Sequence, residues 1–289
     1  MLNVPRAQVV GIIGGNEQVA NSLSPAIHDA AFAAAGLDWR YERFPVDTDV
    51  ARAIDHLVAS GVRGLNVTMP HKTRAIDAMD ELSEAAEQIG AINTIQIHDG
   101  YKIGHNTDGP GLVGHIKGDL GVEITGRSVL VLGAGGGARA AVWSLARAGA
   151  SSITVASRDN GASRSLASVA GEVPFESLAL PVDQKRTASS QIIVNATPVG
   201  QKGEEPLIST QAIAPGAIVV DLVYWPPVTP LIELARRRGA IASSGLGMLL
   251  HQAALSFEIW TGVQPNLGAM SAAATSGLAG FKTSTPPAE

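Results

Sequence analysis

The stretch Ser128-Val129-Leu130-Val131-Leu132-Gly133-Ala134-Gly135-Gly136-Gly137-Ala138 decides the fold class of this chain of 289 residues. Its first five residues contain four consecutive apolar side chains, and such a short apolar run predicts a buried strand. Residues 139–147 carry a helical pattern directly after the glycines. Further strand-like runs alternate with helical patterns; they lie at 152–157, 191–195, 217–222 and 240–242. This alternation predicts a parallel sheet that is covered by helices on both faces.

The glycines of this stretch stand where a tight turn must join the strand to the helix. Ala138 replaces the third glycine of the pattern Gly-x-Gly-x-x-Gly, a position that requires only a small residue. The backbone N–H groups of such a loop bind a pyrophosphate at the helix N-terminus, whereas the alternative is a plain turn without a ligand. Because both flanks of the loop have the required pattern, we expect a dinucleotide site. Its expected lining is Gly133, Ala134, Gly135, Gly136, Gly137 and Ala138.

The end of the next strand indicates which nicotinamide cofactor binds. NAD sites usually carry an acidic residue there, which binds the ribose 2′-hydroxyl. Here Ser157 and Arg158 occupy this position, with Arg164 nearby. A hydroxyl and a forked guanidinium suit a 2′-phosphate, so we expect NADP. Asp159 keeps NAD open as the alternative, because a shift by one residue would bring a carboxylate to the ribose.

The first part of the chain has a β/α rhythm of its own. Strand patterns at 9–13, 39–46 and 64–68 alternate with helical patterns at 25–34 and 49–59. We expect an acidic, alanine-rich helix that runs to Gln88, then a hairpin that turns at Asp99-Gly100. Ser24 is expected to cap the helix that begins at Pro25.

Composition excludes several classes of function. The net charge of −5, with no basic cluster longer than Arg236-Arg237-Arg238, argues against nucleic acid as a partner. The absence of cysteine excludes disulfides, thiolate chemistry and cysteine–zinc sites. Of the seven histidines, His71 and His251 lie closest to the motifs described below, and neither has a partner at ligand spacing, so no metal site is expected. We expect no membrane partner and a cytoplasmic location, because no leader pattern or membrane-spanning apolar run is present.

The stretch Asn66-Val67-Thr68-Met69-Pro70-His71-Lys72 raises the question of an acid/base lysine. It runs from a buried strand into a polar turn, and turns after strands often carry reacting groups. Most lysines are simply solvated, so Lys72 alone does not answer the question. Four further motifs combine glycine or proline with small hydrogen-bonding side chains, as a polyhydroxylated ligand requires. These motifs are Asn21–Pro25, Gly90–Thr94, Gly104–Gly109 and Gly245–Gln252.

Together these motifs resemble the shikimate dehydrogenase family over nearly the whole chain, from about Val10 to Gly262. The motifs Asn195–Gly200 and Asp221–Pro226 also match the family. Asn21 departs from it, because members often have histidine there, and residues 16–20 depart as well. Both departures touch the rim of the expected site and leave its two serines intact.

The resemblance implies an α/β fold with two domains and an active site in the cleft between them. Residues 1–109 would form a substrate domain with a mainly parallel sheet, completed by a C-terminal helix at 246–280. Residues 110–245 would form a Rossmann-like NADP-binding domain, and 281–289 a disordered tail.

The resemblance also implies an oxidoreductase that reversibly reduces 3-dehydroshikimate to shikimate with NADPH, in chorismate and aromatic amino-acid biosynthesis. Lys72 and Asp108 would form the acid/base pair at the reacting hydroxyl. The substrate would be held by Ser22, Ser24, Thr68, Asn93, Tyr224 and Gln252. Besides the glycine loop, the cofactor would contact Ser157, Arg158, Thr197, Gly245 and Met248.

The chemistry of alcohol oxidation agrees with such a pair. The cofactor accepts only the hydride, so a base must take the hydroxyl proton. A neighbouring carboxylate favours the charged form of a lysine and desolvation opposes it, so the sequence leaves open which of Lys72 and Asp108 carries the proton.

Three alternatives remain open at this point. One is a quinate/shikimate dehydrogenase that uses NAD; Ser24 favours shikimate, because relatives that prefer quinate often have threonine there. The second is a non-catalytic sensor that binds a shikimate-like ligand, which would have little use for the Lys72–Asp108 pair. The third is a Rossmann reductase with an unrelated substrate. The expected partner is a small molecule, with a homodimer as the candidate assembly.

Overall fold

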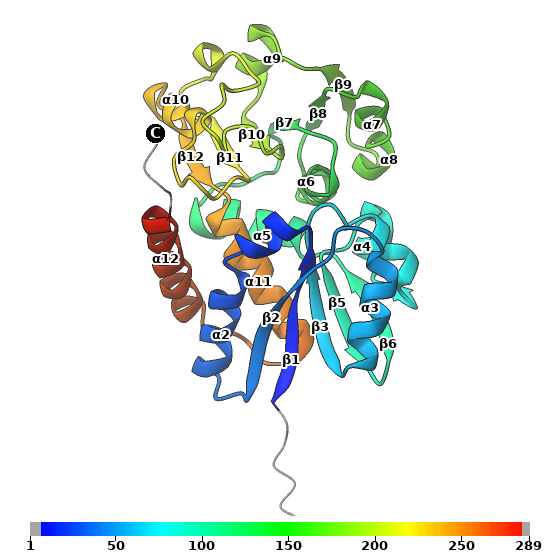
Figure 1. The fold of residues 1–289 in the computed structure, drawn as a ribbon. Coiled ribbons are helices and arrows are strands. Elements are labelled where there is room, and N and C mark those ends of the chain that lie inside the picture. Colours follow the sequence, from blue (N-terminus) through cyan, green and yellow to red (C-terminus); the bar gives the residue numbers. More distant parts are fainter. Residues whose placement is uncertain (1–6, 285–289) are drawn as a thin grey trace, which may run out of the picture. The chain divides into compact units, whose positions relative to one another are not determined.

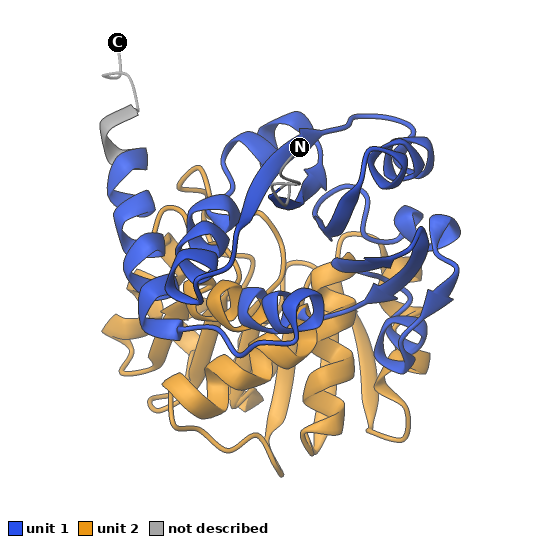
Figure 2. Cartoon of the chain, turned by 90° about the horizontal axis from the view of Figure 1, so that it is seen from below, with its two compact units in different colours: residues 1–107, 253–289 blue, residues 108–252 orange. Residues whose placement is uncertain are grey.

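The computed structural model describes residues 7–284, and these divide into two compact units (Figure 2). Unit 1 takes the described residues up to Thr107 and those from Ala253 on, and unit 2 takes Asp108–Gln252. Within the described residues, each unit contains one six-stranded sheet (Figure 1). The predicted α/β class with two sheets is therefore confirmed.

The sheet of unit 1 has the strand order β2-β1-β3-β5-β6-β4. Its strands are β1 (Gln8–Gly14), β2 (Trp39–Pro45), β3 (Val62–Val67), β4 (Glu81–Leu82), β5 (Thr94–His98) and β6 (Tyr101–His105). Its helices are α1 (Asn16–Ala20), α2 (Ser24–Ala34), α3 (Val50–Ala59), the 3-10 helix η1 (Arg74–Ala78), α4 (Glu84–Ile89), α12 (Leu267–Ser284) and the second half of α11 (Leu246–Thr261). Strands β2, β1 and β3 are parallel, while β5 runs antiparallel to both β3 and β6.

One face of this sheet packs against α3. Ile13, Leu65 and Ile95 of the strands are fully buried, and Val50 and Ile54 of the helix join the same core. The helix starts where the sequence indicates, because the Asp49 side chain accepts a hydrogen bond from the backbone N–H of Arg52. The apolar stripe predicted for residues 49–59 thus covers the sheet.

The opposite face of the same sheet carries a cluster of aromatic rings from α2 and α11. Phe32 and Phe257 lie 5.2 Å apart between ring centroids, and His28 stacks on Tyr41 at 4.7 Å. The Trp260 ring lies 5.2 Å from His28. Phe, Trp and Tyr make up only 4% of the chain, and four of these residues are concentrated with His28 in one core.

The predicted hairpin at Asp99-Gly100 is confirmed. Both residues have positive φ angles, 50° and 86°, which a two-residue turn between twisted strands requires. The turn joins β5 to β6 with His98 opposite Tyr101.

The sheet of unit 2 has the order β12-β11-β10-β7-β8-β9, and all neighbouring strands are parallel. Its strands are β7 (Ser128–Leu132), β8 (Ser152–Ser157), β9 (Phe175–Ala179), β10 (Ile192–Asn195), β11 (Ile218–Asp221) and β12 (Ile241–Ser244). Its helices are α5 (Asp108–Gly114), the π-helix η2 (His115–Asp119), α6 (Gly136–Arg147), α7 (Asn160–Arg164), α8 (Ala167–Ala170), α9 (Gln184–Ser189), the 3-10 helix η3 (Thr210–Ala212), α10 (Pro230–Arg237) and the first half of α11.

Both faces of this sheet are buried, as predicted from its continuous apolar runs. Val129 and Val131 belong to one core, whereas Leu130 and Leu132 on the same strand belong to the other. Successive side chains of a strand point to opposite faces, so helices must cover both sides. Strand β9, which pairs with β8, was not predicted because its burial is only partial.

Two local predictions in unit 1 are wrong. Ser24 does not cap α2: Leu23 is the cap residue, and Ser24 is the first helical residue, whose N–H donates to the Ser22 hydroxyl. The helix expected to run to Gln88 is interrupted, because β4 pairs with β6 and Ser83 then caps a new helix, α4. Tertiary pairing here overrides the helical propensity of an alanine-rich segment.

The single C-terminal helix predicted at 246–280 is two helices. Gly262, with φ of 69°, follows the end of α11, and α12 begins at Leu267. The boundary between the units falls inside α11, so residues 246–252 belong to unit 2. The tail predicted at 281–289 begins as helix, because α12 continues to Ser284; residues 285–289 lie outside the described residues. No helix between residues 7 and 284 has the length and apolarity to cross a membrane.

Candidate active site

Lys72 lies in a turn that is fastened to the sheet of unit 1. The N–H of Thr68, directly after β3, donates to Ile13 at 2.9 Å, and the N–H of His71 donates to the Thr68 carbonyl at 3.0 Å. The N–H of Ile92 donates to the Lys72 carbonyl at 2.8 Å. Lys72 itself is half-buried, whereas His71 is fully buried with its ring Nε2 2.6 Å from the Val46 carbonyl oxygen. The turn is therefore held on several sides while the lysine keeps partial exposure.

Asn93 lies beside this turn and is almost fully buried. Its carbonyl accepts the N–H of Val67 at 2.8 Å, which links it to the end of β3. Its side-chain amide donates to the Thr107 hydroxyl at 2.8 Å, and its Oδ1 accepts the Thr107 N–H at 2.7 Å. The structure thus places Thr68, Lys72 and Asn93 on neighbouring connected segments of unit 1.

Asn66 is a buried polar residue whose role sequence reasoning missed. Its Oδ1 accepts the Tyr41 hydroxyl at 2.8 Å, and its amide donates to Thr94 at 3.2 Å and to Ser256 at 3.0 Å. Ser256 lies on α11, so the network ties that helix to the sheet. The available signal was an asparagine between the apolar residues Leu65 and Val67 of a strand, because a buried amide must find partners.

Ser22, in the loop before α2, and Ser24, the first residue of α2, form a small buried polar group. The Ser22 hydroxyl accepts the N–H of Ser24 at 3.1 Å, and both residues are less than 10% exposed. The Arg43 guanidinium donates to the carbonyls of Val19 at 3.0 Å and Ser22 at 2.9 Å. Arg43, which was not among the predicted residues, therefore holds the loop that leads into α2.

The glycine loop of unit 2 joins β7 to α6, as predicted. Gly133 has φ of 109°, and a Cβ there would lie 3.0 Å from the Ala196 carbonyl oxygen, so the protein itself requires this glycine. Gly135 is different: its φ is −80°, and an added Cβ would meet no atom within 4 Å. No side chain caps α6, whose first N–H groups face this loop. A glycine that the fold does not need, at an uncapped helix N-terminus, fits the close approach of a pyrophosphate.

The end of β8 distinguishes the two cofactor hypotheses. The Asp159 carboxylate accepts the N–H groups of Gly161 at 2.8 Å and Ala162 at 3.1 Å, so it caps α7. The Ser157 hydroxyl donates to the Asp159 carbonyl at 2.5 Å, and Arg158 is exposed. Asp159, the acidic residue that left NAD as an alternative cofactor, thus caps a helix. The guanidinium of Arg158 is exposed and accessible to a phosphate.

Thr197 belongs to a buried polar cluster at the ends of β10 and β11. Its hydroxyl donates to Asn195 at 2.6 Å, and Asn195 donates in turn to the Asp221 carboxylate at 2.9 Å. Asp221 also accepts the Thr229 hydroxyl at 2.6 Å. Burial raises the pKa of Asp221, and these hydrogen bonds offset part of that effect.

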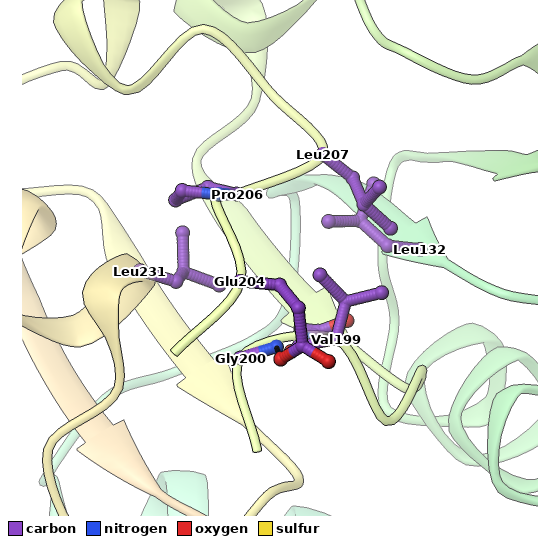
Figure 3. Close-up of a pocket in the computed structure, with 8 residues that line it drawn as sticks. Leu132, Val199, Gly200, Glu204, Pro206, Leu207 and Leu231 are labelled. Carbon is purple, nitrogen blue, oxygen red and sulfur yellow. Dashed lines mark hydrogen bonds between the residues drawn. The ribbon is translucent and has the colours of Figure 1, made fainter. Parts of the chain in front are cut away.

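Beside this cluster lies a small pocket (Figure 3). The Glu204 carboxylate there accepts the N–H groups of Gly200 at 2.9 Å and Lys202 at 2.8 Å, which closes the loop after Thr197. The pocket is lined by Leu132, Asn195, Val199, Gly200, Glu204, Pro206, Leu207 and Leu231.

The remaining predicted residues of unit 2 lie at the β12–α11 junction and on α5. A Cβ on Gly245 would lie 2.3 Å from the Leu222 carbonyl oxygen, so close backbone packing explains this glycine. Met248 is 8% exposed and belongs to the core of unit 2, and Gln252 donates to the Leu249 carbonyl at 2.9 Å. Asp108 is the first residue of α5 and is 4% exposed.

Tyr224, between β11 and α10, is half-buried. Lys72 and Asp108 belong to different units, so their pairing stays a prediction. The predicted residues of unit 1 are neutral donors and acceptors with one lysine, and unit 2 contains the glycine loop.

Family models match most of the chain. They are the shikimate dehydrogenase substrate binding domain at residues 12–95, the shikimate / quinate 5-dehydrogenase model at 116–229 and the shikimate 5′-dehydrogenase C-terminal domain at 245–275. A protein of Citrifermentans bemidjiense named shikimate dehydrogenase (NADP(+)) is 44% identical over 273 residues, which cover 92% of this chain and 93% of that protein.

Two solved structures have the same TM-score, 0.86. One is a shikimate dehydrogenase in complex with NADP+, 36% identical, with 94% of this chain and 96% of that chain covered. The other is the ligand-free 5-ketofructose reductase of Gluconobacter sp. strain CHM43, 31% identical, with 94% and 99% covered. The resemblance drawn from the motifs is confirmed: the chain belongs to the shikimate dehydrogenase family.

Proposed function

We propose that the protein is an NADP-dependent shikimate dehydrogenase, which reversibly reduces 3-dehydroshikimate to shikimate in the pathway to chorismate and the aromatic amino acids. The observation that carries this proposal is the 44% identity, over nine-tenths of the chain, to a protein of that name. The helix-capping role of Asp159 and the exposure of Arg158 support NADP as the cofactor. The cytoplasmic location and the homodimer stay predictions.

In this reaction a carbonyl carbon receives a hydride and its oxygen receives a proton. The nicotinamide supplies the hydride when it is bound. Lys72, on a fastened turn after β3, donates the proton from Nζ to the carbonyl oxygen, and takes it back in the oxidative direction. Asp108 orients the ammonium and the reacting hydroxyl. A fixed turn matters here, because proton transfer requires hydrogen-bond distance to the substrate oxygen.

The other predicted residues bind and orient the two ligands. Ser22, whose loop Arg43 holds, and Ser24 bind the substrate carboxylate with Tyr224 nearby. Thr68, Asn93 and Gln252 hydrogen-bond to ring hydroxyls. On the cofactor side, the glycine loop binds the pyrophosphate, and Ser157 and Arg158 bind the 2′-phosphate. Thr197, Gly245 and Met248 border the nicotinamide. Met248 does so from its position in the core of unit 2.

Initial rates on four substrate–cofactor pairs test this function. Shikimate with NADP+ should be oxidised faster than shikimate with NAD+ or quinate with either cofactor. Efficient oxidation of quinate with NAD+ would contradict the proposal and indicate a quinate dehydrogenase, an activity that the matching family model also names. Ligand binding without any cofactor reduction would indicate the non-catalytic sensor.

A second candidate comes from the structural similarity to the 5-ketofructose reductase. Reduction of 5-ketofructose with NADPH should therefore be assayed in parallel. We expect a rate far below that on 3-dehydroshikimate, since the two serines and Tyr224 are assigned to a carboxylate that 5-ketofructose lacks.

The role of Lys72 is tested by Lys72→Ala and Lys72→Met, with exposed Lys185→Met as the matched control. Loss of an acid/base group should lower kcat by roughly 10²- to 10⁴-fold, with little change in the KM for NADP+. Near-normal kcat with a raised KM for shikimate would show that Lys72 only binds substrate. The control should keep wild-type values for both constants.

A further inference from the structure

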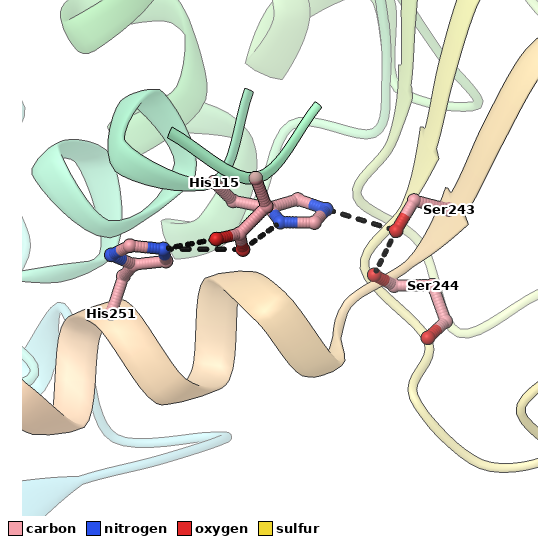
Figure 4. A network of polar contacts seen from close by, with 5 residues as sticks. His115, Ser243, Ser244 and His251 are labelled. Atoms are coloured by element: carbon pink, nitrogen blue, oxygen red, sulfur yellow. Dashed lines mark hydrogen bonds and ion pairs between the residues drawn. The ribbon is translucent and has the colours of Figure 1, made fainter. Parts of the chain in front are cut away.

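Two histidines of unit 2 share one carboxylate, outside the residues assigned so far (Figure 4). The Nδ1 of His115 lies 2.7 Å from one oxygen of Asp119, and the Nε2 of His251 lies 3.1 Å from both oxygens. The Nε2 of His115 lies 2.9 Å from the Ser243 hydroxyl. We call His115, Asp119, His251 and Ser243 the histidine bridge. It joins three elements: η2, β12 and the first half of α11.

The backbone around the bridge leaves room for both imidazoles. A Cβ on Gly247, in the first turn of α11, would lie 2.0 Å from the Nδ1 of His115. A Cβ on Gly114 would lie 3.0 Å from the Nδ1 of His251. Glycine at these two positions therefore allows close ring packing, and the His115 side chain is only 5% exposed. This close packing indicates that the contact between these elements is a specific part of the fold, and not a chance pair of surface residues.

The protons of the bridge can be assigned from its chemistry. An ionised carboxylate only accepts, so the Nδ1 of His115 and the Nε2 of His251 carry the protons that point to Asp119. Burial raises the pKa of Asp119, but the hydrogen bonds and the electrostatic attraction of both histidines together outweigh it, and the pKa lies below its usual value. The carboxylate is therefore ionised at neutral pH, which strengthens both hydrogen bonds.

Ser243 supplies a partner for the second ring nitrogen of His115. Its hydroxyl lies 2.9 Å from Nε2 of the ring and 3.2 Å from the Ser244 carbonyl oxygen, which can accept from it. Within residues 7–284, no group of three or more His, Cys, Asp or Glu side chains has an arrangement that could hold a metal ion.

We propose that the histidine bridge positions the first half of α11, and through it Gln252, for the reaction described above, on whose assignment this inference rests. His251 directly precedes Gln252, and the boundary between the units follows at Ala253. Gln252 packs closely against Gly111, where a Cβ would lie 2.8 Å from its backbone nitrogen. An anchor on the residue before Gln252 therefore holds the turn of α11 backbone that carries the Gln252 side chain. The bridge residues are positioning residues, because they act through α11.

The test replaces His251 by leucine and by glutamine, and Asp119 by asparagine. Glutamine can place an N–H donor near the position of Nε2, whereas leucine cannot. We expect His251→Leu and Asp119→Asn to raise the KM for shikimate by about three- to tenfold while kcat changes less than about twofold. His251→Gln should restore a KM close to wild type. Glu123→Gln, an exposed carboxylate paired with Lys117 at 3.3 Å, is the matched control.

A second measurement does not depend on activity. Amide hydrogen exchange in peptides from residues 244–252 should be faster in His251→Leu and Asp119→Asn than in wild type, His251→Gln or Glu123→Gln. An unchanged exchange rate, or faster exchange with an unchanged KM, would overturn the inference. If wild type has no activity on shikimate, the proposed function fails, and the exchange data alone then decide whether the bridge holds α11.

Discussion

At the scale of single residues, the buried His28 makes stability depend on pH. The ring is fully buried against Tyr41, and burial lowers its pKa from 6.5 to about 3, with the nearby Asn66 offsetting part of the shift. The unfolded chain therefore binds a proton more readily than the folded one. This contribution to stability is complete above the unfolded pKa and is lost as the pH falls below about 6.5.

We predict that wild type loses about 2 kcal/mol of unfolding free energy between pH 7 and pH 5 relative to His28→Phe. Urea unfolding at both pH values measures the difference. His98→Gln, at a histidine with a 75% exposed side chain, is the matched control. Equal slopes for wild type and His28→Phe would contradict the prediction, and an NMR titration of the His28 ring gives an independent check.

The contribution of Asp221 to stability changes with pH in the opposite direction from that of His28. Its raised pKa means that the folded state binds the proton more readily, so its contribution to stability grows as the pH falls and is lost as the pH rises through the folded pKa. Asp221→Asn should therefore lose stability relative to wild type at acidic pH, with the gap narrowing toward neutral pH. Exposed Glu172→Gln is the control. A stability difference between wild type and Asp221→Asn that widens toward neutral pH would contradict the raised pKa of Asp221.

Truncation of the same residue should cost more than neutralisation. Asp221→Ala removes the carboxylate that accepts from the Asn195 amide, the Thr229 hydroxyl and the Val223 N–H. We expect a loss of roughly 2–4 kcal/mol at neutral pH, because three buried donors lose a partner. Chemical denaturation of the two variants side by side gives this comparison.

At the scale of elements, the β7–α6 and β12–α11 turns contain glycines for different reasons. Gly135→Ser adds a good N-cap residue in open space, so thermal stability should be kept. The KM for NADP+ should rise by about tenfold or more, because the new side chain fills the pyrophosphate position. Gly245→Ala should instead lower the unfolding free energy by about 1–3 kcal/mol through its clash with the Leu222 carbonyl. Unchanged cofactor affinity in Gly135→Ser would rule out the loop as the dinucleotide site.

At the scale of the whole molecule, ligand binding should stabilise the folded state by mass action. NADP+ at about 100 times its Kd adds about 2.7 kcal/mol, which corresponds to a rise in Tm of roughly 5 °C for a chain of this size. Differential scanning fluorimetry with NADP+ and NAD+ at equal concentration measures the preference directly. A larger shift with NAD+ would contradict the role of Arg158.

The sequence by itself determined the α/β class, the two sheets, the glycine loop and the family, because these rest on local patterns. Apolar runs specify buried strands wherever both faces of a sheet are covered, as in β7. Residues such as Gly133 and Asp99-Gly100 have backbone requirements that a short segment already contains. The order of the motifs along the chain was sufficient to identify the family.

Only the tertiary structure decided which polar groups meet. The pairing of β4 with β6 broke a segment with helical propensity, and Ser24 proved to be helical instead of a cap. Asp159 was found to cap a helix, and Met248 to lie in a core. His115, Asp119 and His251 are separated by more than 130 residues of sequence at their extremes, yet they share hydrogen bonds. Such contacts depend on how distant elements pack, and local sequence patterns carry no record of that packing.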